Sequence, residues 1–184
     1  MSEKTICIYC DGACAGNQNE VNRGGWGAIL EYGKYVREIY GGEKNTTNNR
    51  MEITALISAL EALTKRNLPI HVFSDSAYVM NCMRDGWYLR WQRNGWMNSK
   101  KEPVENRDLW EKLIPYLTHY DFRFFLIKGH LNPNSDEKIL KKAYGKFIQN
   151  NGDLFGFDEF MSIVKRNNRA DELANIGIDF PGGE

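Results

Sequence analysis

The chain has no long apolar run and no excess of charge of either sign. Its 24 Lys and Arg residues balance its 24 Asp and Glu residues, and 42% of its 184 residues are hydrophobic. Mean hydropathy is −0.55. This composition excludes a disordered chain, and no run approaches the length of a membrane span. The first residues carry no signal-peptide pattern, so we expect a cytoplasmic protein with no membrane partner.

Cysteine is scarce, with four residues at Cys7, Cys10, Cys14 and Cys82. Cys7 and Cys10 have the spacing of zinc and redox motifs. However, no second Cys/His pair follows at zinc-site spacing, and alternation along a strand turns these two side chains to opposite faces. We therefore expect free thiols and no disulfide framework.

The hydrophobic pattern predicts an α/β protein with the order β-β-β-α-β-α-α-β, an inserted segment and a last helix. Residues 4–10 alternate as a strand does, and Gly33-Lys34 separates two β-prone runs, as in a two-residue hairpin. Apolar residues recur at helical spacing over 48–66, which is the clearest helix. The remaining elements are short strands at 71–74 and 122–127 and helices at 76–84 and 107–119.

No linker, repeat or low-complexity segment divides the chain, so residues 1–184 are predicted to form a single domain. The segment between Gly129 and Asn167 is too regular for a plain loop. Its apolar residues predict a helix over 136–150, and a second short helix is expected over 158–165.

Four acidic residues stand where predicted strands end or helices begin. Asp11 ends the first strand and Asp75 the short apolar strand, whereas Glu52 opens the clearest helix and Asp171 lies near the start of the last one. Such positions can converge at one edge of an open α/β sheet. Carboxylates that close raise one another's pKa, and a hard divalent cation such as Mg²⁺ or Mn²⁺ relieves the repulsion. The pattern therefore indicates a metal-dependent enzyme.

Five short motifs surround these acids: Asp-Gly at 11–12, Thr-Thr-Asn-Asn-Arg-Met-Glu at 46–52, Asp-Ser-x-Tyr-Val at 75–79, Lys-Gly-His at 128–130 and Asn-x-x-x-Asp-Glu-Leu-Ala at 167–174. In this order they resemble type 1 ribonuclease H, the bacterial-type enzyme. The resemblance implies the ribonuclease H-like fold, a mixed five-stranded sheet with its first three strands antiparallel, flanked by helices. It also implies an endonuclease, expected to be monomeric, that hydrolyses the RNA strand of RNA/DNA hybrids and leaves 5′-phosphomonoesters.

The same resemblance implies roles for individual residues. Two Mg²⁺ ions, replaceable by Mn²⁺, would be held with Asp11 shared between them, Glu52 and Asp75 on one side and Asp171 on the other. His130 would carry a proton or aid product release. Residues that match substrate-contacting positions of the family are Cys14, Asn17, Thr47, Asn48, Asn49, Trp87, Trp91, Asn106 and Lys128.

Several of these residues have structural alternatives. Thr47 can act as a helix cap, and Trp91, within a segment at 84–107 that resembles the family's hybrid-gripping basic protrusion, can belong to the core. The loop after His130 is short in the family. Here residues 131–167 are predicted to be a helical insertion, either packed on the domain or forming a clamp beside the site. The insertion leaves three other acids as alternatives to Asp171: Asp153, Asp158 and Glu172.

Two other functions use the same kind of site. A nuclease or strand-transfer enzyme acting on DNA would share the sheet and the acids, and a catalytically silent module would bind the hybrid without cutting it. Asn48-Asn49 and the Lys-Gly-His motif favour the hybrid because RNA is distinguished from DNA through its 2′-hydroxyls. Acids at all four positions argue against a silent module.

Overall fold

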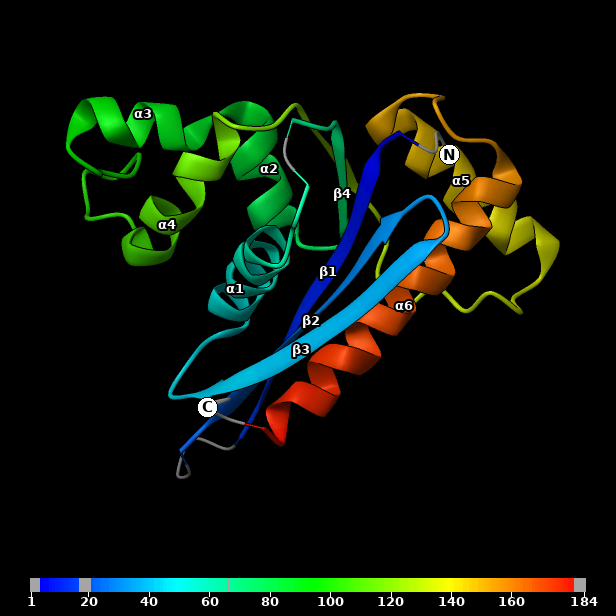
Figure 1. Ribbon diagram of the computed structural model, residues 1–184, viewed down its shortest axis with the longest axis horizontal. Helices are drawn as coiled ribbons and strands as arrows, with labels where there is room; N and C mark the ends of the chain where they lie inside the picture. The colour runs from blue at the N-terminus through cyan, green and yellow to red at the C-terminus, as the bar shows by residue number, and fades with distance from the viewer. Residues whose placement is uncertain (1–3, 17–20, 66, 181–184) are drawn as a thin grey trace.

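A single mixed sheet organises the chain, as the computed structural model in Figure 1 shows; it describes residues 4–16, 21–65 and 67–180. The strands lie in the order β3-β2-β1-β4-β5. The first three pair antiparallel, whereas β1, β4 and β5 run parallel, which confirms the predicted sheet. The strands are β1 Ile6–Ala15, β2 Arg23–Tyr32, β3 Tyr35–Lys44, β4 Ile70–Ser74 and β5 Phe122–Leu126.

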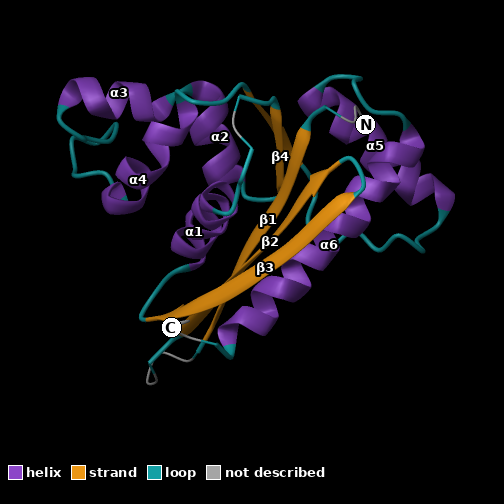
Figure 2. Cartoon of the chain, in the orientation of Figure 1, coloured by secondary structure: helices purple, strands orange, loops and turns teal. Residues whose placement is uncertain are grey.

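Helices cover both faces of this sheet (Figure 2). The first face carries α1, with α2 and α4 packed beside it, and the second face carries α6. A further helix, α5, packs along β5. The helices are α1 Asn48–Glu61, α2 Ala77–Asp85, α3 Trp87–Asn94, α4 Arg107–Leu117, α5 Glu137–Asn151 and α6 Phe157–Ile178.

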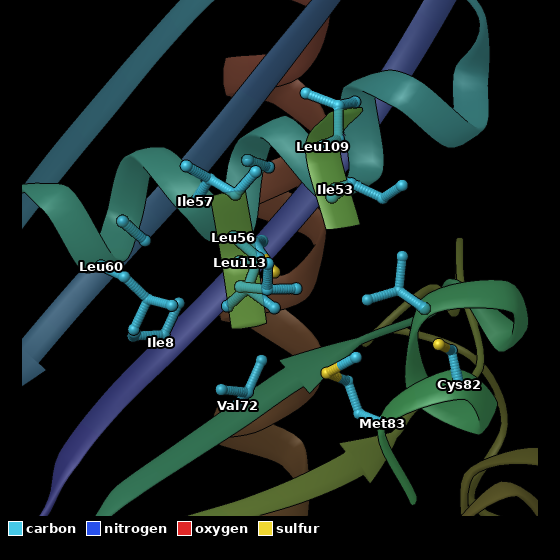
Figure 3. Packing of buried hydrophobic residues seen from close by; sticks show 14 of the residues in the cluster. Ile8, Ile53, Leu56, Ile57, Leu60, Val72, Cys82, Met83, Leu109 and Leu113 are labelled. Atoms are coloured by element: carbon cyan, nitrogen blue, oxygen red, sulfur yellow. The ribbon is translucent and has the colours of Figure 1, made fainter. Parts of the chain in front are cut away.

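The alternation of β1 divides the hydrophobic core in two. Ile8 and Cys10 point into a cluster with α1, where Ile53, Leu56 and Leu60 pack against Val72 (Figure 3). Cys7 and Tyr9 point into a second cluster with α5 and α6. Because the two faces of a strand alternate, β1 is buried on both sides and holds the centre of the sheet. All four cysteines are free, as predicted.

The last helix begins earlier than the sequence analysis placed it. A separate short helix over 158–165 and a new helix starting near Asp171 were both wrong, because α6 is continuous and Asp171 lies past its middle. Its first turn is fixed by Gly156, whose backbone N–H donates to Glu159 Oε2 at 3.0 Å. A buried apolar stripe then continues through the whole helix, so nothing ends it at residue 165. The stripe consists of Phe160, Ile163, Val164, Ala170, Leu173 and Ala174.

Residues 131–167 form one complete helix and part of a second. The predicted helix over 136–150 is confirmed as α5, which buries Leu140, Ala143 and Phe147 in the second cluster. The second half of the segment is the first half of α6. Across residues 4–16, 21–65 and 67–180, no helix combines the length and apolarity needed to cross a bilayer.

Candidate active site

Asp11, Glu52 and Asp75 meet beside the first two parallel strands. A ligand atom from each lies within 4.8 Å of the others. Asp11 lies in β1 and Asp75 directly follows β4, and these strands pair in parallel up to Tyr9 and Phe73. Glu52 sits early in α1, which packs on β1. The predicted convergence of these three acids is confirmed, and both Asp11 and Glu52 are only 4% exposed.

Two glycines make the close approach possible. A Cβ on Gly12 would lie 2.5 Å from the backbone nitrogen of Glu52, so any side chain there would push α1 away from β1. A Cβ on Gly129 would lie 2.2 Å from Asp75 Oδ2. A side chain at residue 12 would therefore displace backbone, and one at residue 129 would displace the Asp75 carboxylate, so both glycines keep the carboxylates at their present separation.

Burial and mutual repulsion make this cluster electrostatically strained without a cation. Burial, and then the charge of Asp75, raises the pKa of Asp11 to about 7. Burial, with the charges of Asp11 and Asp75, raises the pKa of Glu52 well above its usual range. The pKa of Asp75 is raised mainly by burial, and a hydrogen bond from Asn167 opposes that rise. The ionised cluster is thus short of positive charge.

Asp171 belongs to the same site, although it lies outside the tight group of three. Its charge raises the pKa of both Asp11 and Asp75. His130, with 78% of its side chain exposed, places Nδ1 3.7 Å from Asp171 Oδ2. Of the alternatives, Glu172 instead pairs with Arg169 at 2.7 Å. The geometry favours Asp171 as the fourth acid, carried by the second half of α6 and not by its start.

Asn167 is a site residue that the sequence analysis missed. It is 1% exposed, it hydrogen-bonds Asp75, and its Oδ1 is buried without a partner among the residues that the structure describes. The neighbouring Asn168 donates from Nδ2 to the carbonyl of Leu131 at 2.9 Å, which ties the loop after His130 to α6. The sequence feature that could have indicated Asn167 is its spacing from Asp171, because residues four apart lie on one face of a helix.

Thr47 and Asn106 are brought together by Arg50, a second residue that was missed. Thr47 caps α1, its Oγ1 accepting from the Arg50 backbone N–H at 3.2 Å. The Arg50 guanidinium donates to Asn106 Oδ1 at 3.4 Å and to both carboxylate oxygens of Asp108, at 3.0 and 2.8 Å. Asn106 also donates to the hydroxyl of Tyr78 at 3.4 Å. The start of α1 is thereby joined to the start of α4.

The two tryptophans predicted to contact substrate differ in exposure. Trp91 is 8% exposed and packs between Trp87, Trp96 and Trp110, with ring centroids 6.3, 6.1 and 5.7 Å away. Its indole is therefore part of the core, which favours the packing role that the sequence left open for it. Trp87 is half-buried at the start of α3 and keeps a face available.

The remaining predicted contact residues lie on the surface near the cluster or outside the described ranges. Asn48 and Asn49 are exposed in the first turn of α1, and Lys128 is exposed two residues after β5. Cys14 is exposed at the end of β1, where its Sγ lies 3.8 Å from the Thr46 carbonyl oxygen. Asn17 lies outside the residues that the structure describes.

Sheet order and carboxylate cluster together define a metal-dependent nuclease with the ribonuclease H-like fold. The sequence matches the RNase H family over residues 3–140, more than half of the chain. It is 50% identical over 135 residues to a ribonuclease H of Syntrophomonas wolfei, covering 73% of this chain and 90% of that one. The chain belongs to the ribonuclease H family and is an endoribonuclease.

Two further comparisons extend beyond residue 140. A ribonuclease H of Symbiobacterium thermophilum is 47% identical over 175 residues, 95% of each chain, so this match includes much of α5 and α6. The solved structure of LC11-RNase H1 in complex with RNA/DNA hybrid is 21% identical, with a TM-score of 0.55 over 95% of this chain and 96% of that one. At that identity the solved structure supports the fold alone.

Proposed function

We propose that this ribonuclease H hydrolyses the RNA strand of RNA/DNA hybrids at the Asp11–Glu52–Asp75 cluster and leaves 5′-phosphate ends. The observation that carries the proposal is the cluster itself, with ligand atoms from all three acids within 4.8 Å in a protein of this family. Membership of the ribonuclease H family supports the choice of substrate.

The donor set fits divalent metal ions. Glu52 Oε2 is buried and has no hydrogen-bond partner among the described residues. Burial and the neighbouring carboxylates raise the pKa of Asp11 and of Glu52, so the ionised form of the cluster needs a countercharge. Hard oxygen donors of this kind suit Mg²⁺, with Mn²⁺ as a substitute. We propose two ions, with Asp11 shared, Glu52 and Asp75 holding one and Asp171 the other. Bound ions would supply the Lewis acidity that activates water and neutralises charge on the phosphate.

Protein groups around the acids position them and move protons. Asn167 holds the Asp75 carboxylate from the buried side, and Gly129 lets the backbone after β5 pass directly beside it. His130 stands in solvent with Nδ1 3.7 Å from Asp171, where an imidazole can accept a proton from an attacking water or deliver one to the leaving oxygen. The exposure of His130 and its position beside Asp171 support this role as a proton carrier.

Substrate contacts would surround the cluster on three sides. Asn48, Asn49 and Cys14, with Asn17 outside the described ranges, are proposed to contact the 2′-hydroxyls or backbone of the RNA strand. Thr47 and Asn106, joined through Arg50, would hold a phosphate of the DNA strand. Half-buried Trp87 and exposed Lys128 would make further contacts with the backbone of the hybrid.

A cleavage assay on matched substrates tests the proposal. The protein is incubated with Mg²⁺ and an end-labelled RNA/DNA hybrid, the corresponding duplex DNA or duplex RNA. Cleavage is expected in the RNA strand of the hybrid alone, and chelation with EDTA should abolish it. An Asp11→Asn variant is the control for a contaminating nuclease, because it alters one metal-binding carboxylate and leaves the purification unchanged.

The alternatives give different results in the same assay. Cleavage of duplex DNA but not of the hybrid would identify a DNA nuclease, and hybrid binding without cleavage would identify a silent module. We further propose that the protein acts as a monomer in the cytoplasm. Light scattering on the purified protein should then report the mass of one chain.

A further inference from the structure

One face of α5 is basic and unused by the site described above. Lys138, Lys142, Gly145 and Lys146 form this α5 outer face, and all four are exposed. Helix α5 contains four lysines and one acidic residue, which gives +4 − 1 = +3, whereas the whole chain has a net charge of zero. The single acid, Glu137, pairs with Lys141 at the flank of this face.

The α5 outer face points away from the protein. Leu140, Ala143 and Phe147 anchor the opposite side of the helix in the second hydrophobic cluster. Lys138 and Lys142 are four residues apart, as are Lys142 and Lys146, so the three side chains follow one another along the surface. Within residues 4–16, 21–65 and 67–180, none of the three forms an ion pair. Their charges are available to a partner.

Gly145 is difficult to explain by packing within the protein. It lies inside α5, where glycine costs about 0.5–1 kcal/mol relative to alanine. A Cβ at Gly145 would meet no atom within 4 Å, so no neighbour requires its absence. An ordinary solvated lysine face does not need a glycine at its centre. A flat position between basic side chains instead suits a bulky ligand backbone that approaches the helix closely.

The C-terminal end of α5 is held near the carboxylates. Its last residue, Asn151, hydrogen-bonds the backbone N–H and carbonyl of Leu126 through its side chain, each at 2.8 Å. Leu126 is opposite Ser74, the residue before Asp75. The strand spacing of about 4.8 Å and a helical rise of about 1.5 Å per residue place the α5 outer face within roughly 20 Å of the site.

The position of α5 complements that of α3. In Figure 1 the two helices lie at opposite ends of the molecule, with β1 and β4 between them. A distance of roughly 20 Å corresponds to about six nucleotides at about 3.4 Å each. A nucleic acid that fills the active site and continues toward α5 therefore passes within reach of these lysines.

We propose that the α5 outer face binds the sugar-phosphate backbone of the RNA/DNA hybrid, several nucleotides from the cleaved bond and on the side opposite α3. The proposal rests on the proposed function for its substrate. Lysines on this face would displace counterions from the phosphates, and Gly145 would let the backbone lie close to the helix. The helix would extend the length of hybrid that the enzyme grips without touching the reacting phosphate.

Hybrid binding by a Lys142→Gln/Lys146→Gln variant tests this proposal. Binding of a fluorescent 20-base-pair hybrid is measured in EDTA over a salt series, so that the readout does not depend on cleavage. The variant should bind about 5–20-fold more weakly at low salt, and its plot of log affinity against log salt should be less steep by about 2. A Lys34→Gln/Lys65→Gln variant has the same net charge, but its substitutions lie outside α5, in the β2–β3 hairpin and after α1; it should match the wild type.

Gly145→Ala separates the ligand role from a structural one. Alanine should raise the melting temperature, because it favours the helix, yet weaken hybrid binding by about 3-fold or more if the backbone approaches closely. Equal affinities for the wild type, the lysine variant and the Gly145→Ala variant would overturn the proposal. A failure of the proposed function is seen separately, as absence of Mg²⁺-dependent hybrid cleavage by the wild type.

Discussion

Asp11 occupies a position that favours chemistry over stability. It is nearly fully buried beside two other acids, and burial with the charge of Asp75 raises its pKa to about 7. The folded protein therefore binds more protons than the unfolded chain between about pH 4 and pH 7. Without metal, these carboxyls make stability fall as the pH rises through that window.

Replacing Asp11 by Asn should therefore stabilise the metal-free protein near neutral pH. Above pH 7 the gain is expected to be about 1–3 kcal/mol, and it should shrink as the pH falls toward 4, where the wild-type carboxyl is protonated. Thermal melts of both proteins in EDTA at pH 5.5 and 7.5 measure this. Mg²⁺ should raise the melting temperature of the wild type at pH 7.5 more than that of the variant.

The comparison of the two proteins removes the contribution of other titrating groups. Burial lowers the pKa of His71, which by itself makes stability rise as the pH rises from that lowered value toward the group's unfolded value. His71 is present in both proteins, so its effect cancels in the difference. A gain for Asp11→Asn that stayed constant from pH 4 to pH 7.5 would contradict the electrostatic explanation.

His130 should affect turnover and not substrate affinity. Its side chain is exposed, and its Nδ1 lies 3.7 Å from Asp171 Oδ2. His130→Ala is expected to lower kcat about 10–100-fold with little change in KM, because a proton carrier acts after the substrate binds. His119, exposed after α4, supplies a matched control in His119→Ala. Equal kcat for the wild type and His130→Ala would remove His130 from the mechanism.

At the scale of elements, α5 protects the open edge of the sheet. β5 is an edge strand, and edge strands leave backbone groups free to pair with other chains. Asn151 occupies the backbone N–H and carbonyl of Leu126, and Arg84 donates to the carbonyl of Phe124 at 2.8 and 2.9 Å. These side chains thus make hydrogen bonds to β5 of the kind that a sixth strand would make.

Asn151→Ala should expose this edge. The loss of four hydrogen bonds, two with Leu126, one to the carbonyl of Phe147 and one from the Arg84 guanidinium, is expected to cost about 1–3 kcal/mol of unfolding free energy. Chemical denaturation measures the loss, and the protein should also aggregate faster on heating. Replacement of the adjacent exposed Asn150 by Ala serves as the control. A variant as stable as the wild type would mean that water replaces the amide fully.

At the scale of the whole molecule, the segment after the Lys-Gly-His motif completes the second hydrophobic cluster. Phe155 packs against Phe73 and Phe125 of the sheet, with ring centroids 5.6 and 5.1 Å away. Phe160, from the first half of α6, packs against Phe147 at 5.1 Å. Part of the core therefore comes from residues that the sequence analysis set apart as an insertion.

Deletion of residues 132–165 with a short glycine linker should abolish cooperative folding. The deletion removes α5 and the first half of α6, and it exposes aromatic side chains of β4 and β5. Buried phenylalanines each contribute about 3–5 kcal/mol, so the loss exceeds the usual stability of a domain. A calorimetric scan should show no sharp transition. A folded deletion protein with a normal melting temperature would show that the segment is dispensable for packing.

Sequence alone was sufficient for the sheet, for the convergence of Asp11, Glu52 and Asp75, and for α5. These features depend on local signals: alternation in β1, a hairpin turn at Gly33-Lys34, and helical spacing of apolar residues. The five short motifs around the acids indicated the family, which the comparisons confirm.

Tertiary structure decided what depends on neighbours from distant parts of the chain. Only the folded sheet shows that Asn167 faces Asp75, that Arg50 joins Thr47 to Asn106, and that Trp91 is buried. The continuity of α6 was not predicted. The family motif suggested that a helix starts near Asp171, whereas the buried apolar residues continue through this region without a break. Local periodicity specifies elements, whereas the partners of a polar side chain are specified by the packing that brings those elements together.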